Sequence, residues 1–131
     1  MEPNSLVNDE IEAGADLVAL FDKSMSVTVA FWAKLADASQ WYLYIASDRI
    51  DAVGLDEGYR EVHRLTQENP GLDLFRVKLI PPDHPLALAA LEACRRFPGG
   101  RRPVRFQEKV VDALFVEEAY VYPVSLLAPS A

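Results

Sequence analysis

The stretch VTVAFWAKL at Val27–Leu35, followed after a short turn by WYLYIA at Trp41–Ala46, decides the fold. Along the first stretch Val27, Val29 and Phe31 fall on one side of an extended chain, and the residues between them fall on the other. The second stretch is again rich in aromatic and β-branched residues, which favour strands. Because a polar turn at 37–39 joins the two, the sequence predicts a β-hairpin.

The segments on either side of this hairpin predict three helices and further strands. We expect the helices at Asn8 or Asp9 to about Ser24, at Gly54–Glu68, and from a cap at Asp83 to near Phe97. We expect a strand at Leu74–Ile80 and two or three short strands between Val104 and Val124, with turns at Lys109 or at Glu117-Glu118. The order α-β-β-α-β-α-β-β predicts an α+β fold with a mostly antiparallel sheet and helices mostly on one side.

Length and composition predict one globular domain. A chain of 131 residues buries enough surface for one core and is too short for two ordinary domains. We expect frayed ends at about residues 1–6 and 126–131. The single cysteine, Cys94, excludes an intramolecular disulfide and fits a reducing, cytoplasmic compartment. The sequence shows neither a signal peptide nor an apolar run of about 20 residues, so we expect a soluble protein without membrane partners.

One basic segment stands out against an acidic chain of net charge −7. Five of the nine arginines lie between residues 95 and 105: Arg95, Arg96, Arg101, Arg102 and Arg105. Guanidinium groups bind phosphate and carboxylate in a bidentate manner, and Gly99-Gly100 allows a close backbone approach, so the segment predicts an anion site. The alternative is structural: cations favour a helix C-terminus, and the others can pair with carboxylates of the same chain.

Aromatic and basic residues share one side of each predicted strand. This set comprises Trp32, Tyr42, Tyr44, Arg76, Lys78, Tyr120 and Tyr122. If the strands align, these residues form one sheet face that could serve as a dimer or partner interface. The same face could stack nucleic-acid bases. A helix over this face would instead make the rings ordinary core residues.

Motifs for catalysis and metal binding are missing from the sequence, and no family signature is found in it. There is no Cys-x-x-Cys, no His-x-x-x-His and no Gly-rich phosphate loop followed by Lys-Ser or Lys-Thr. We therefore expect no cofactor and no metal. A small metal-dependent hydrolase or nuclease remains a third hypothesis, with Asp48, Asp51, His63 or Cys94 as its candidate residues.

These patterns favour a non-enzymatic interaction module that docks on a protein partner or on a second copy of itself. The alternative is a domain that binds nucleic acid or a phosphorylated ligand through residues 95–105. The acidic net charge opposes general coating of nucleic acid.

Overall fold

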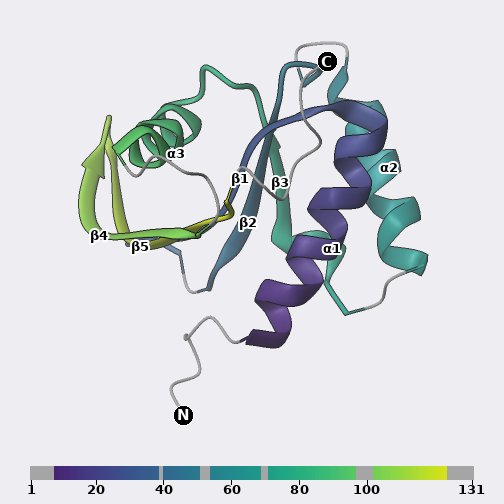
Figure 1. The fold of residues 1–131 in the computed structure, drawn as a ribbon, viewed down its shortest axis with the longest axis horizontal. Helices are drawn as coiled ribbons and strands as arrows, with labels where there is room; N and C mark the ends of the chain where they lie inside the picture. The colour runs from purple at the N-terminus through teal and green to yellow at the C-terminus, as the bar shows by residue number, and fades with distance from the viewer. Residues whose placement is uncertain (1–7, 39, 51–53, 69–70, 97–101, 124–131) are drawn as a thin grey trace.

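A five-stranded mixed sheet runs through the computed structural model, which describes residues 8–38, 40–50, 54–68, 71–96 and 102–123 (Figure 1). The strands are β1 (Val27–Leu35), β2 (Tyr42–Ser47), β3 (Val77–Ile80), β4 (Val104–Val111) and β5 (Leu114–Val121). Their spatial order is β3-β2-β1-β5-β4, with β3 parallel to β2 and the other neighbours antiparallel. The helices are α1 (Asn8–Met25), α2 (Gly54–Glu68) and α3 (Pro85–Arg96), with a short 3-10 helix η1 at Leu74–Arg76.

The predicted α+β fold and the predicted order of its elements are confirmed. The sheet is mixed, because the chain reaches β3 through the crossover helix α2 and so returns parallel to β2. None of the described helices combines the length and the apolar character needed to cross a bilayer. The predicted frayed ends lie outside the described residues.

Two of the three described helices lie on one face of the sheet, in keeping with the expected placement mostly on one side, and the third lies on the other face. The first face carries Trp32, Leu43 and Leu79 and packs against α1 and α2. The second face carries Phe31 and Ile80 and packs against α3. Figure 1 shows α1 and α2 on one side of β1–β3, and α3 on the other side, within the curve of the β4–β5 hairpin. The core therefore has two parts, one on each face.

A buried hydrogen-bonded cluster joins α1 to the centre of the sheet. The indole Nε1 of Trp32 donates to the hydroxyl of Tyr122 at 2.7 Å, and that hydroxyl donates to the carbonyl of Ile11 at 2.7 Å. Trp32 is fully buried, so its indole N–H would cost about 1–3 kcal/mol if it were left unpaired. Gly14 lies against this cluster and allows α1 to approach it.

Local side-chain bonds explain where several elements begin and end. Asp73 accepts a hydrogen bond from the amide of Phe75 at 2.9 Å and starts η1, so β3 begins at Val77 rather than at Leu74. The cap of α3 is His84, whose Nδ1 accepts the amide of Leu86 at 3.1 Å, and not Asp83. The β4–β5 turn lies at residues 112–113, where Asp112 has φ 56°, so the expected turns at Lys109 or Glu117-Glu118 are wrong.

We expect Gly14→Ala to destabilise the protein. A Cβ at this position would lie 2.4 Å from the Tyr122 hydroxyl and 3.0 Å from Trp32 Nε1, which is overpacking. Such overpacking costs about 1–3 kcal/mol, against about 1 kcal/mol gained from replacing glycine in a helix. Urea unfolding of Gly14→Ala, with and without Tyr122→Phe, measures this effect.

The double variant is the internal control, because Tyr122→Phe removes the atom that the new methyl group meets. The cost of Gly14→Ala should therefore fall in the Tyr122→Phe background. An equal cost in both backgrounds would show that the hydroxyl does not set the distance between α1 and the sheet.

Candidate interaction surface

The aromatic residues expected on one open face are divided between the two faces of the sheet. In the β1–β2 register Trp32 lies opposite Leu43, while Phe31 lies opposite Tyr44. Directly opposite residues share a face, so Tyr44 lies with Phe31 and not with Trp32. The structure thus brings Trp32, Tyr120 and Tyr122 together and leaves the β2 tyrosines on the other side.

Three of the expected interface rings are buried. Trp32 and Tyr122 are enclosed under α1 in the hydrogen-bonded cluster described above. Tyr44 stacks on Phe31 with ring centroids 5.3 Å apart and planes 12° apart. Burial raises the pKa of Tyr44 to about 12 and also raises that of Tyr122, so both phenols stay neutral at physiological pH.

Arg76 is tied into the fold from several directions. Its guanidinium donates twice to the carbonyl of Trp41, at 3.1 and 3.0 Å, and forms an ion pair with Glu10 of α1. It also lies 5.3 Å from the centroid of the Trp32 ring. These bonds connect α1, η1 and the start of β2, so in this structure Arg76 is engaged within the fold rather than extended into solvent.

Two cation–ring pairs that include expected interface residues lie at the surface, one on each face. On the second face, Lys78 is exposed and its ammonium lies 4.6 Å from the Tyr42 ring centroid. On the first face, the Arg105 guanidinium lies 4.9 Å from the Tyr120 ring centroid. Burial raises the pKa of Tyr120, and the nearby Arg105 charge partly opposes that rise.

The first face of β4 and β5 extends beyond α1 and α2 and carries several exposed strand residues. We call this surface the hairpin outer face; its side chains come from three cross-strand pairs, Arg105 with Tyr120, Gln107 with Glu118, and Val110 with Phe115. Val110 is 69% exposed and Phe115 is 41% exposed. Polar residues border this apolar pair, including the Lys34–Glu117 ion pair at 2.5 Å.

A left-handed residue in β4 sets this pattern. Glu108 has φ 50°, an uncommon conformation for a residue other than glycine. After it the alternation of side chains shifts, so Lys109 lies on the side of Phe106, with its ammonium 5.5 Å from that ring centroid. Val110 is consequently turned to the hairpin outer face beside Phe115. Sequence periodicity could not reveal this shift, because nothing in the sequence around Glu108 signals a positive φ.

The basic segment is described only in part. Arg101 lies outside the described residues. Arg95 and Arg96, at the end of α3, are 77% and 67% exposed at their side chains and share Glu92 at 3.8 and 3.6 Å. Arg102 and Arg105 are exposed at the beginning of β4. No carboxylate of the described residues lies within ion-pair distance of Arg102 or Arg105.

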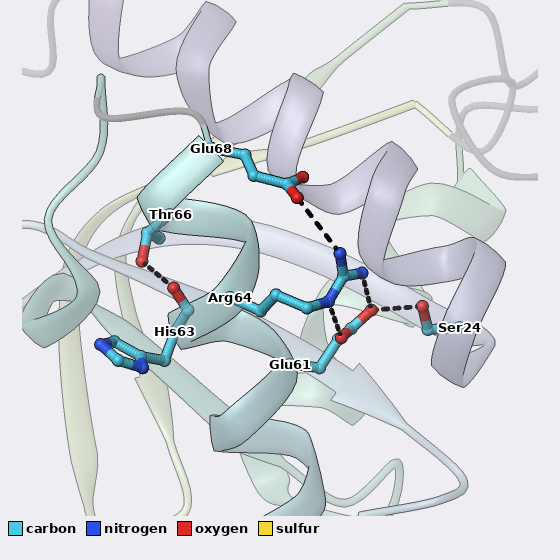
Figure 2. A network of polar contacts seen from close by, with 6 residues as sticks. All are labelled: Ser24, Glu61, His63, Arg64, Thr66 and Glu68. Carbon is cyan, nitrogen blue, oxygen red and sulfur yellow. Dashed lines mark hydrogen bonds and ion pairs between the residues drawn. The ribbon is translucent and has the colours of Figure 1, made fainter.

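The residues of the hydrolase hypothesis are not assembled into a site. His63 lies on α2 with its ring turned away from the carboxylates of Glu61 and Glu68 (Figure 2). Burial raises the pKa of Cys94, which favours the inert thiol. His63 belongs to α2 and Cys94 to α3, and these two helices cover opposite faces of the sheet. Asp51 lies outside the described residues, and no group of three potential metal ligands occurs within the described ranges.

A polar network connects the end of α1 to α2 (Figure 2). The Arg64 guanidinium donates to both carboxylate oxygens of Glu61 at 2.8 Å, and the Ser24 hydroxyl donates to the same carboxylate. Glu68 contributes a longer ion pair with Arg64 at 3.5 Å. The hydrogen bond from Arg64, followed by that from Ser24, lowers the pKa of Glu61 from 4.5 to about 2. The network joins α1 to α2 and engages the Glu61 carboxylate in structural bonds.

We expect Glu61→Gln to lower stability at neutral pH, with a loss that disappears in acid. The folded-state pKa is below the unfolded-state value, so the carboxylate contributes stability above about pH 4.5 and loses it as the pH falls toward about 2. The effect is small because the ion pair is open to solvent. Thermal unfolding from neutral pH to acid measures it, with Glu57→Gln on the same helix as the control. A gap between wild type and Glu61→Gln that persists at the acid limit would contradict the ionic role.

Comparisons with known proteins add no relationship to this geometry. No protein-family model matches the chain, and neither a curated protein nor a solved structure matches it.

Proposed function

We propose that the protein is a non-enzymatic, cytoplasmic interaction module that docks on a protein partner, or on a second copy of itself, through the hairpin outer face. The observation that carries this proposal is the exposure of Val110 and Phe115 directly across from one another on a part of the first sheet face that no described helix covers. Elsewhere on this face α1 and α2 bury comparable side chains. Exposed apolar side chains with a polar border are typical of protein-binding surfaces.

The neighbouring residues add specificity to this apolar centre. Tyr120 lies beside Arg105, and both residue types are enriched at interfaces. The rings of Tyr120 and Tyr122 pack edge to face with centroids 5.4 Å apart and an interplanar angle of 82°, so the buried cluster holds the half-buried Tyr120 ring in place. A ring fixed in this way loses little conformational entropy on binding.

We expect the double variant Val110→Glu/Phe115→Glu to abolish docking while the fold survives. Loss of a central apolar anchor costs about 2 kcal/mol or more, which weakens binding by more than tenfold. Light scattering measures self-association, and quantitative capture from a lysate measures a partner. The unfolding temperature should change little, because both side chains are exposed.

The matched control is Phe75→Glu, which removes another exposed aromatic residue, 83% exposed and next to β3 rather than on β4 or β5. Docking should be retained in this variant. If both variants, or neither, change the molar mass in solution or the amount of protein captured from the lysate, the hairpin outer face is not the docking surface.

The exposure of four arginines supports a second function, the binding of nucleic acid or a phosphorylated ligand. Arg95, Arg96, Arg102 and Arg105 all extend into solvent where α3 ends and β4 begins, and Arg101 belongs to the same sequence segment. Three to five phosphate contacts would give a log–log dependence of affinity on salt with a slope of roughly −2 to −5.

Fluorescence anisotropy with labelled single- and double-stranded oligonucleotides tests this second function. Under it, binding weakens as salt rises and is lost in Arg102→Ala/Arg105→Ala. Absence of binding at low salt, or a flat salt dependence, would exclude it.

A further inference from the structure

Among the described residues, β4 has a strand neighbour on one side only, and this edge carries cations that no described carboxylate pairs with. β4 is the last strand of the sheet, and its eight residues make it longer than β3, the four-residue strand at the opposite edge. β5 is its hydrogen-bonding neighbour on one side only. An edge strand presents backbone N–H and C=O groups that another extended chain can pair with.

Cations lie on both sides of this edge. Arg105 projects on the hairpin outer face, over Tyr120, and Lys109 lies on the α3 side, over Phe106. Arg102 is exposed immediately before the strand. Among the ion pairs of the described residues, none engages Arg102, Arg105 or Lys109. The charged groups of Arg105 and Lys109 themselves lie over these rings, in cation–π contact, and no described carboxylate pairs with them.

These charges decide which chain can add to the edge. In an antiparallel pair of two β4 strands along Val104–Gln107, the two Arg105 side chains would lie on the same face, and like charges across a strand pair are destabilising. An extended chain with carboxylates would instead meet Arg105 on the hairpin outer face and, beyond Glu108, Lys109 on the α3 side. The left-handed Glu108 interrupts regular pairing, so the pairing segment is Val104–Gln107, which contains Arg105.

We propose that β4 binds an extended acidic peptide segment of a partner protein, which adds to the sheet as a sixth strand along Val104–Gln107. This inference rests on the proposed function as an interaction module and names the chemistry of its partner. The acidic body of the protein, net charge −7, repels a long polyanion, whereas a short peptide places its few carboxylates only at this basic edge. The backbone groups of the edge also complement a peptide and not a phosphodiester.

The probe is a fluorescein-labelled eight-residue peptide with the sequence Glu-Glu-Val-Val repeated, which places carboxylates on both sides when extended. A peptide with lysine in place of glutamate tests charge. An acidic peptide N-methylated at its central amides keeps the carboxylates and removes the backbone donors. Anisotropy at low salt should show binding of the first peptide alone.

The protein variant is Arg105→Glu/Lys109→Glu, and its matched control is Lys23→Glu/Arg60→Glu, which reverses the same number of exposed charges away from β4. We expect the edge variant to bind the acidic peptide roughly tenfold more weakly or worse, and the control to lose little by comparison. Thermal unfolding of both variants confirms that they fold. Equal loss in the two variants would reduce the effect to net charge and overturn the proposal.

Other results also overturn it. If the N-methylated peptide binds as well as the unmodified one, the edge is an electrostatic patch and no strand is added. If the acidic peptide does not bind at all, the proposal has no basis. If a competing single-stranded oligonucleotide binds more tightly than the acidic peptide, the edge is a phosphate-binding site instead. If the peptide fails while Val110→Glu/Phe115→Glu still abolishes docking, the proposed function stands and only the acidic-strand inference fails.

Discussion

The buried hydrogen bond between Trp32 and Tyr122 is the constraint on which the arrangement of this domain depends. It joins β1 to Tyr122, the residue directly after β5. The Tyr122 hydroxyl in turn donates a hydrogen bond to the Ile11 carbonyl in α1. The three residues are far apart in sequence, so the bond closes the fold at its centre. Gly14 is required there because any larger side chain would meet the hydroxyl. The same cluster fixes Tyr120 and thereby the base of the hairpin outer face.

Unequal coverage of the sheet follows from the position of this cluster. α1 and α2 lie over β1–β3 on the first face, while α3 contacts β1 and β4 on the second. Three helices are too few to cover five strands on both sides, so the parts of the sheet farthest from each layer remain open. One open part is the hairpin outer face, and the other carries the Tyr42–Lys78 pair. The exposed aromatic residues are therefore a consequence of helix number and placement.

Sequence periodicity predicted the elements well and their mutual facing poorly. The alternation in Val27–Leu35 and the stop signals around Gly54–Glu68 gave strands and helices close to the observed ones. The aromatic face failed to assemble because the register of β1 against β2 is set by the turn between them and by packing on both sides. A shift of one residue would have placed Tyr44 beside Trp32. The change of side-chain alternation at Glu108 likewise exchanged the faces of residues in β4. It created the exposed Val110–Phe115 pair that the sequence did not reveal.

The position of the arginines and lysine relative to aromatic rings explains how an acidic protein can keep a basic edge. An ion pair at the surface would immobilise a long cationic side chain on an edge strand at an entropic cost. Such a pair contributes little free energy in return. A charged group placed over a ring, as Arg105 is over Tyr120 and Lys109 over Phe106, holds the side chain without a carboxylate partner. The arrangement discourages pairing between identical edges, because their cations would meet. Only a chain of opposite charge gains from the same contacts, so protection against self-association and selection of an acidic partner arise from one feature of β4.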